Sequence, residues 1–430
     1  MQSVGVMCLR PKETLVNEMM PERDAGSAKL KYPSMPEIKS WLPKEVFQLS
    51  TVNSMSYFAR DAALILATQF AIASIRATTT YQSWALPLQL LSLLPLQFLG
   101  GFFMWCMFVV GHDCGHTTFS QFQSVNELMG ETAHSFFLCT PFDPWRRSHH
   151  RHHSFHNHFV EDYSHMWFFK SELQKPGTTR SPIPFSAYLH YCVRAVTPLI
   201  NWPFYLFIGR PDGGHLFLYG RLWKDAKWGE LARGYVSSAV TLASMYFWYT
   251  ALSPSHNFVA CYVMPWVWYG WWLFTVTYFQ HHFDEMVLFE RASTQKNSTF
   301  VQSLPQYRTP AFAICPKLYS NLVEQGAWSY VRGAFETIDR TFGLGIDNFH
   351  HNITDCHVVH HLLFTKIPHH NLRKATDAMC AGLKANGYPT LYKHEQTRDF
   401  FPKIFKFFTE HWFLVDDEKV ISKLKDGKIE

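Results

Sequence analysis

Charged residues are scarce in this chain, since Asp, Glu, Lys and Arg make up 17% of its 430 residues, against roughly 25% in typical soluble domains. The net charge is only +5 and there is no basic tract, which argues against nucleic acid as a partner. Aromatic residues also reach 17%. Few charges together with many Trp and Tyr residues indicate a chain that meets a lipid bilayer, where these side chains collect at the interface.

Paired cysteines and a secretion signal are also missing. The nine cysteines are scattered, none forms a C-x-x-C pair and their number is odd. The sequence therefore predicts no disulfide framework and a reducing environment. The first residues include Arg10, Lys12 and Glu13 and no apolar run follows them, so we expect no cleaved signal peptide.

Four segments of the chain are long, apolar and nearly free of charge. They span residues 58–79, 85–111, 235–255 and 257–280. Each reaches the length of about 20 residues that a helix needs to cross the hydrocarbon core of a bilayer. Only a few residues separate the members of each pair, so each connection is expected to be a tight turn. The sequence therefore predicts an all-α membrane protein with four transmembrane helices in two hairpins.

The remaining segments divide the chain and orient it. An N-terminal segment covers residues 1–57, the hairpin region 58–281 includes a long loop at 112–234, and a cap over 282–400 precedes a tail at 401–430. The loop holds twelve Lys and Arg residues, whereas the two turns hold none. Since positive charge stays on the cytosolic side of a membrane, we expect the loop, the cap and both termini in the cytosol.

Three dense groups of histidines, here called boxes 1, 2 and 3, are the main chemical feature. Box 1 is His112-Asp113-Cys114-Gly115-His116, box 2 is His149-His150-Arg151-His152-His153 and box 3 is His357-Val358-Val359-His360-His361. Histidines three or four apart share one face of a helix. Imidazole is the commonest protein ligand for transition metals, and the eight histidines at this spacing, all but His150, exceed the usual four ligands of one zinc ion. The simplest interpretation is two metal ions.

Residues near the boxes complete the predicted site. His281 follows the fourth apolar segment, at the same depth as His112, and is predicted as a ninth ligand. A ligating imidazole normally donates its other N–H to a carboxylate or carbonyl. Residues expected in this supporting role are Asp113, Asp355 and His351, with the acids Glu161 and Asp162 that follow box 2. His150 would point away from the other histidines of its helix and is expected to be a bystander, and no catalytic side chain is predicted beyond the ligands.

Several longer motifs carry a resemblance to a known family. They are Val110 to His116, Pro144 to His149, Arg332-Gly333 with Thr337 to Arg340, and His351 to His361. With three histidine boxes around two apolar hairpins, these segments resemble the membrane-bound fatty acid desaturases, and more closely their methyl-end group of delta-12 (omega-6) and omega-3 enzymes. Phe364 to His369 and Pro211 to His215 look most like the nematode branch of that group. The resemblance covers residues 36–379 and leaves 286–326 as an insertion in the cap.

This resemblance implies a fold and a chemistry. The fold would be two transmembrane hairpins with a cytosolic helical cap that carries a histidine-ligated diiron site. The implied iron ligands are His112, His116, His149, His152, His153, His281, His357, His360 and His361. Two iron ions, cycling between Fe2+ and Fe3+, would use O2 as co-substrate. Electrons would come from a separate cytochrome b5 and NADH-cytochrome b5 reductase, because the H-P-G-G signature of a fused heme domain is missing. The implied location is the endoplasmic reticulum membrane.

Box 3 also bears on where the double bond would be placed. Front-end desaturases usually carry Gln where this chain has His357, so the resemblance favours a methyl-end enzyme. Asn352 to Asp355 looks more like the delta-12 members, which favours desaturation of oleate to linoleate on an acyl-lipid or acyl-CoA carrier. An omega-3 (delta-15) or dual delta-12/delta-15 desaturase is the alternative, and a diiron lipid hydroxylase is a more distant one. A metal transporter is disfavoured, because transporters place ionisable residues inside their spans and these spans have no central histidine.

Overall fold

A computed structural model describes residues 32–158, 161–165, 199–209, 212–252, 257–281 and 328–396, and the backbone of 168–169 and 414–415. This part of the chain is mostly helical, as predicted. Its strands are very short. β1 (Phe168–Phe169) pairs in parallel with β4 (Leu414–Val415), and β2 (Asp339–Thr341) pairs in parallel with β3 (His394–Gln396). The insertion predicted at 286–326 lies outside the described residues.

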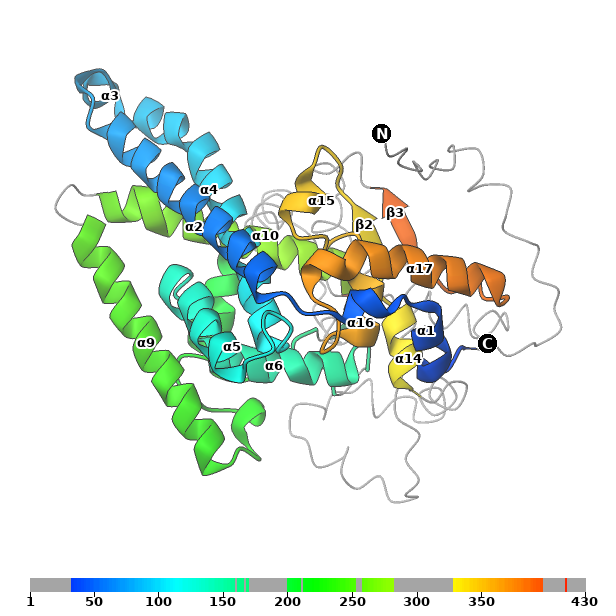
Figure 1. The fold of residues 1–430 in the computed structure, drawn as a ribbon. Coiled ribbons are helices and arrows are strands. Elements are labelled where there is room, and N and C mark those ends of the chain that lie inside the picture. The colour runs from blue at the N-terminus through cyan, green and yellow to red at the C-terminus, as the bar shows by residue number, and fades with distance from the viewer. Residues whose placement is uncertain are drawn as a thin grey trace, which may run out of the picture. The chain divides into compact units, whose positions relative to one another are not determined.

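The first predicted hairpin is formed by α2 (Thr51–Arg76) and α4 (Leu86–Gly115), which pack along each other (Figure 1). Both are long and apolar enough to cross a membrane. The Ser50 side chain caps α2 by accepting from the Asn53 backbone N–H. The connection at 80–84, predicted as a tight turn, is instead a short helix, α3 (Thr79–Ser83), because the Thr78 side chain caps its first turn.

The second predicted pair corresponds to α9 (Trp228–Leu252) and to the π-helix η6 (Val259–Val263), which runs into α10 (Met264–His281). In the described part of the chain these two helices do not meet the length and hydropathy criteria that α2 and α4 meet. Helix α9 falls short of the hydropathy criterion because it carries a row of small polar residues. Ser237, Ser238, Thr241 and Ser244 are buried, while the opposite face exposes aromatic and aliphatic side chains such as Val236 and Tyr246.

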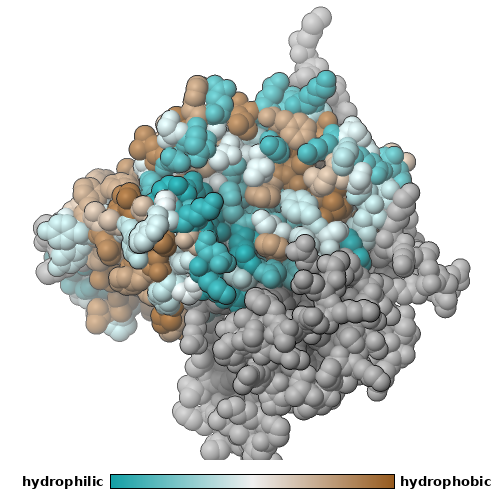
Figure 2. Space-filling model, turned by 90° about the horizontal axis from the view of Figure 1, so that it is seen from below, coloured by the Kyte–Doolittle hydropathy of each residue, from teal (hydrophilic) through white to brown (hydrophobic). Residues whose placement is uncertain are grey.

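Exposed apolar side chains gather on these long helices. Phe70 on α2, Leu86 and Leu91 on α4, and Tyr246 on α9 each leave more than 60% of their surface exposed. Figure 2 shows hydrophobic residues concentrated toward one end of the described surface, next to a hydrophilic region. Large exposed apolar patches mark contact with a partner or a membrane, which agrees with the membrane character predicted from the composition.

Helices α4 and α10 approach each other unusually closely, and this contact sets the distance between box 1 and His281. A Cβ atom on Gly101 would lie 2.7 Å from both the Pro265 carbonyl oxygen and the Tyr269 nitrogen of α10. Only glycine allows the two backbones so near. The C-terminal ends of these helices carry His112 and His116 on one side and His281 on the other.

Shorter helices build the cap over the ends of α4 and α10. They are α5 (Gln123–Gly130), the π-helix η3 (Glu131–Phe137), α6 (Phe142–Phe155), α14 (Tyr330–Phe335), α15 (Ile346–Phe349), α16 (His357–Leu363) and α17 (Leu372–Ala385). The N-terminal α1 (Met35–Trp41) and the 3-10 helix η2 (Lys44–Phe47) pack against α17, with the Trp41 ring over Gly382. Box 2 therefore lies on α6 and box 3 on α16.

A buried hydrogen bond between a histidine and a carboxylate ties the cap to the first hairpin. Asp61, within α2, is fully buried, and its Oδ2 lies 2.8 Å from Nε2 of His351. Arg60 contacts the other Asp61 oxygen and the Phe349 carbonyl. Because an unpaired buried carboxylate is costly, this contact fixes α2 against the segment that leads into box 3.

Candidate metal centre

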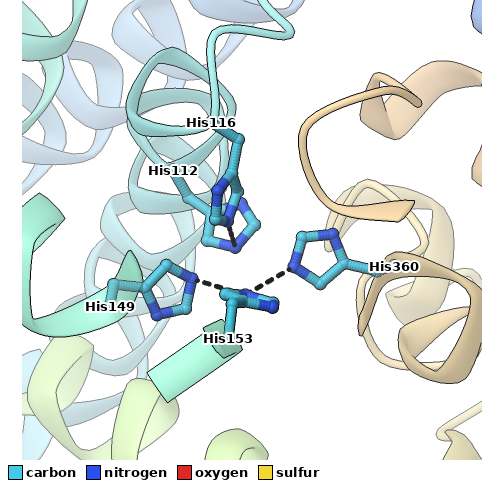
Figure 3. A group of neighbouring side chains, drawn as sticks. All are labelled: His112, His116, His149, His153 and His360. Atoms are coloured by element: carbon cyan, nitrogen blue, oxygen red, sulfur yellow. Dashed lines mark hydrogen bonds between the residues drawn. The ribbon is translucent and has the colours of Figure 1, made fainter. Parts of the chain in front are cut away.

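Helix spacing brings five imidazoles from three elements to one point. His112 and His116 are one turn apart at the end of α4, and His149 and His153 are one turn apart on α6. Their Nε2 atoms are 3.1 Å apart in the first pair and 3.0 Å in the second. Nε2 of His360 on α16 lies 3.1 Å from that of His153. Figure 3 shows these rings, here called the five-histidine group, pointing toward one another.

The other predicted ligands form a second cluster beside the first. His152 on α6, His281 at the end of α10 and His361 on α16 have ligand atoms within 4.8 Å of one another. His357 joins them, with its Nε2 2.9 Å from that of His281 and 3.0 Å from that of His361. All four side chains are buried. We call them the four-histidine group, and the nine predicted ligands are thus divided five and four.

The protonation state of these rings suits metal binding. Burial, and then the neighbouring imidazoles, hold the pKa values of His149, His153, His360 and His361 well below the ordinary value. Neutral imidazole is the form that ligates metals. Several Nδ1 atoms, which point away from the clusters, are buried without a protein hydrogen-bond partner among the described residues. They belong to His112, His116, His153, His357 and His361. A set of all-imidazole donors fits iron, zinc, copper or nickel rather than magnesium or calcium.

One carboxylate supports a box histidine directly. Both oxygens of the buried Asp162 lie within 3.0 Å of Nδ1 of His152, which leaves the Nε2 of that ring for the four-histidine group. Burial alone would raise the pKa of Asp162, but the charge and hydrogen bond of His152 lower it to about 2. Asp162 was among the acids predicted for this role, and it has the geometry expected of such a partner.

The other predicted supporting residues lie differently. Asp113 accepts hydrogen bonds from the backbone and ring nitrogens of His369, at 2.8 and 2.7 Å, and its second oxygen is 3.7 Å from Nδ1 of His112. Asp355 forms an ion pair with Arg373, and burial raises its pKa to about 7. His351 contacts Asp61. Among the described residues, Asp355 and His351 are therefore engaged away from the box rings.

Two nearby histidines have distinct positions. Nε2 of His150 lies 2.7 Å from the Gly115 carbonyl oxygen, so this residue ties box 2 to the end of box 1 from outside the five-histidine group. His165 was not predicted at all, and its ring lies beside those of His152 and His281. No spacing rule could have found it, because it follows α6 in an irregular segment.

The described residues define a mostly helical protein with two candidate membrane helices and two histidine clusters that could hold metal ions. The comparisons with known proteins name its family. Residues 88–393 match the family model described as fatty acid desaturase. A delta(12) fatty acid desaturase, fat-2, of Caenorhabditis elegans is 28% identical over 400 residues, 92% of each chain. The omega-3 desaturase fat-1 of the same organism is 28% identical, over 91% of this chain and 84% of its own.

A plant relative is similar over a shorter part of the chain, at slightly higher identity. The acyl-lipid omega-3 desaturase (cytochrome b5) of the Arabidopsis thaliana endoplasmic reticulum is 31% identical over 351 residues, 80% of this chain and 74% of its own. The chain belongs to the fatty acid desaturase family. It is an oxidoreductase enzyme, a fatty acid desaturase whose relatives include delta-12 and omega-3 enzymes.

Proposed function

We propose that this chain is a methyl-end desaturase that uses O2 to introduce a cis double bond into an unsaturated C18 acyl chain, mainly by delta-12 desaturation of oleate to linoleate. The observation that carries the proposal is the division of nine histidines into two adjacent clusters. One sequence feature supports the regiochemistry, since Asn352 to Asp355 has the delta-12 character described above.

The five-histidine group and the four-histidine group would each hold one iron ion. Bound iron supplies the redox chemistry with O2 that removes hydrogen from an unactivated methylene. In the overall reaction a CH2–CH2 unit, O2, two electrons and two protons give a CH=CH unit and two waters. The protein residues orient the rings and exclude water. Trp145 stacks on His149 at 4.7 Å between ring centroids, and Phe364 stacks on His153 at 4.5 Å.

The cellular setting follows from the same reasoning. We propose four membrane spans, α2, α4, α9 and η6 with α10, with both termini and the three boxes in the cytosol of the endoplasmic reticulum membrane. The buried polar face and exposed apolar face of α9 support its place in the bilayer. Electrons would come from cytochrome b5, which the plant relative's name includes, and its NADH-dependent reductase.

Omega-3 or dual desaturation is the second candidate. The fat-1 relative and this chain are 28% identical, the same value as for fat-2, and this observation favours testing linoleate as a substrate beside oleate. A hydroxylase would use the same metal chemistry and would leave an alcohol in place of the double bond, so product analysis separates it from both desaturases.

Expression in yeast, with gas chromatography of total fatty acids, tests the proposal. Oleate should be converted to linoleate, and cultures fed linoleate report any omega-3 activity. His152→Ala and His360→Ala should abolish the product while the protein remains in the membrane fraction. His394→Ala is the matched control, because His394 is exposed and its side chain contacts Thr341 and Tyr392, outside both histidine groups. Verified protein that gives no new double bond from either substrate would refute the function.

A further inference from the structure

Segment 337–340, one of the motifs that carry the family resemblance, is bonded to the end of α10. All four of its residues are buried. The backbone N–H of Ile338 donates to the Gln280 carbonyl oxygen at 3.2 Å, in the last turn of α10. Nε of Arg340 donates to the Phe279 carbonyl oxygen at 2.6 Å, and a cation at this end of a helix also suits the helix dipole. The segment therefore binds two carbonyl groups at the end of the helix that carries a member of the four-histidine group.

The same segment caps the helix of box 3. Helix α16 begins at His357, and its own N-cap residue, Cys356, makes no side-chain capping bond. Oδ1 of Asp339 instead accepts from the Val358 backbone N–H at 2.8 Å. The first N–H groups of a helix have no partner within it, and a carboxylate at this end is favourable. Asp339 therefore fixes the start of α16 from a distant part of the chain.

Neighbouring contacts fix the direction of the Asp339 carboxylate. Oη of Tyr392 donates to its second oxygen at 2.8 Å. The Asp339 backbone N–H donates to the Lys393 carbonyl oxygen at 3.1 Å, and that of Arg340 donates to the Thr354 carbonyl oxygen at 2.9 Å. Since both carboxylate oxygens and the backbone on either side are engaged, the side chain holds α16 in one position.

The side chain of Gln280 completes this junction between helices. Its Nε2 donates to the carbonyl oxygens of Ile353 and Thr354, at 2.8 and 3.1 Å. The end of α10 is therefore bonded both to segment 337–340 and to the residues that lead into box 3. Across the junction the Nε2 atoms of His281 and His357 are 2.9 Å apart, and this spacing depends on how the two helices are held.

We propose that Asp339 and Arg340 position His281 and His357 to hold the ion of the four-histidine group. The proposal rests on the proposed function, in which each cluster holds one ion. Asp339 acts on the backbone of α16 and Arg340 on that of α10, so both are positioning residues. These two helices supply three of the four imidazoles in this group but only His360 of the other five. Loss of the junction should therefore affect one ion more than the other.

The test uses full-length protein purified in detergent and loaded with iron-57. Iron retained per chain after dialysis against graded chelator would be measured for the wild type, Asp339→Ala, Asp339→Asn and the control Asn371→Ala. The Asn371 side chain also lies in the cap and donates to the Val46 and Gln48 carbonyl oxygens. Asp339→Ala should lose one of two ions at a chelator concentration at least about ten-fold lower than the wild type, as for outer partners of ligands. Asp339→Asn should retain both, because its amide oxygen can still accept from Val358.

Mössbauer spectra identify the ion that is lost. His281→Ala removes a ligand from the four-histidine group, and His116→Ala removes one from the five-histidine group. The spectrum of Asp339→Ala that retains one ion should match that of His281→Ala, and Arg340→Gln should give the same spectrum. Tyr392→Phe keeps the carboxylate but removes its hydrogen bond, so it should lose the same ion at a lower chelator concentration than the wild type. This variant provides the test if Asp339→Ala does not fold.

The outcomes separate this inference from the function on which it rests. Two ions retained equally by the wild type, Asp339→Ala and Tyr392→Phe would overturn the positioning role and leave the function standing. The same selective loss in Asn371→Ala, or a remaining spectrum that matches His116→Ala, would also overturn it, because the effect would then not be specific to the four-histidine group. A wild type that binds no iron would overturn the proposed function and the positioning role together.

Discussion

Asp162 illustrates how much one side chain contributes to this site. It accepts from the His152 ring and from the backbone nitrogens of Asn157 and His165, which lie on either side of it in the sequence. The carboxylate is buried and its pKa is lowered to about 2, since the His152 interactions outweigh the opposing effect of burial. Asp162 therefore stays ionised at physiological pH and holds the tautomer of His152 that presents Nε2 to the cluster.

Replacing this carboxylate by an amide should weaken metal binding. Asp162→Asn keeps the size of the side chain but removes its charge, so we expect iron affinity to fall about 10–100-fold and desaturation to fall with it. Chelator titration and product yield per mole of protein measure the two effects. Glu161→Gln is the matched control, because Glu161 pairs with Arg151 in a partly exposed ion pair. Equal losses in both variants would argue against a specific role for Asp162.

His351 should make stability depend on pH. Burial is the main cause that lowers its pKa to about 4, and Arg60 already balances Asp61 beside it. A histidine in the unfolded chain has a pKa of about 6.5. Between pH 4 and pH 6.5, roughly, the unfolded state therefore binds the proton and the folded state does not. Stability should therefore fall as pH drops from about 6.5 toward 4, by up to about 1.4 kcal/mol per pH unit.

The comparison of His351→Gln with the wild type isolates this contribution. Glutamine can still donate to Asp61 but does not titrate. The thermal unfolding midpoint in detergent should decrease less between pH 7 and pH 5 in the variant than in the wild type. The same decrease in both proteins would show that the proton is taken up elsewhere.

At the residue scale, what could be predicted depends on whether a residue lies in a helix. The box histidines are on α4, α6 and α16, where spacing of three and four residues fixes the shared face, and all nine predicted ligands lie in the two clusters. Asp113 lies within box 1 and Asp355 two residues before box 3, whereas Asp162 follows box 2 by nine residues. Only the path of irregular backbone directs Asp162 to His152 and Asp355 to Arg373, and no periodic pattern reports that path.

At the scale of elements, the close packing of α4 on α10 sets the distance between box 1 and His281. Gly101 is the point of nearest approach, where an added Cβ would lie 2.4 Å from the Trp268 Cβ. Real Cβ atoms are never so close to backbone and side-chain carbons, so any larger residue must separate the helices. Both helices end at the metal centre, and a shift between them changes the spacing of the two clusters.

Gly101→Ala should therefore destabilise the protein and reduce activity. Overpacking of this kind typically costs about 1–3 kcal/mol, which should appear as a lower unfolding temperature in detergent. Gly229→Ala in α9 is the matched control, because nothing lies within 4 Å of an added Cβ there. That variant should be neutral or slightly stabilising, since alanine favours a helix over glycine. Unchanged stability in Gly101→Ala would mean that the helices are free to separate.

The elements themselves were predictable to different degrees. The charge-free run at 85–111 became α4, and the run at 58–79 became the greater part of α2, because length and apolar character decide such helices. The helix in place of the tight turn at 80–84 was missed, since it depends on one capping interaction of Thr78. In α9 the serines and threonine that lower its hydropathy face inward, and a hydropathy average cannot show which side of a helix is buried.

At the scale of the whole molecule, the distribution of charge and apolar surface supports the proposed orientation. Twelve of the 39 arginines and lysines lie in the loop between the hairpins, at 112–234, and none lies in the two turns. Exposed apolar residues lie on α2, α4 and α9. The metal clusters lie where the helix ends meet the cap. In the proposed function, such an arrangement would allow an acyl chain to reach the site from the bilayer while electrons arrive from the aqueous side.

The proposed orientation can be tested by glycosylation mapping. An inserted loop with an N-x-T acceptor should be glycosylated when placed in α3 and should remain unmodified when placed at 219–226. Gel mobility before and after endoglycosidase treatment gives the answer. Modification at 219–226 with none at α3 would reverse the topology and place the boxes in the lumen.

The contact between Asp61 and His351 has a consequence for how the protein is made. The two residues are 290 positions apart, so at about 5–20 residues per second the ribosome completes His351 roughly 15 to 60 s after Asp61. Throughout that interval the nascent first helix carries a carboxylate whose final partner has not been synthesised, with only Arg60 beside it. A chain that terminates before residue 351 cannot form this contact, and its Asp61 keeps only the ion pair with Arg60. Residue 351 must therefore be synthesised before α2 can be fixed against the segment that leads into box 3.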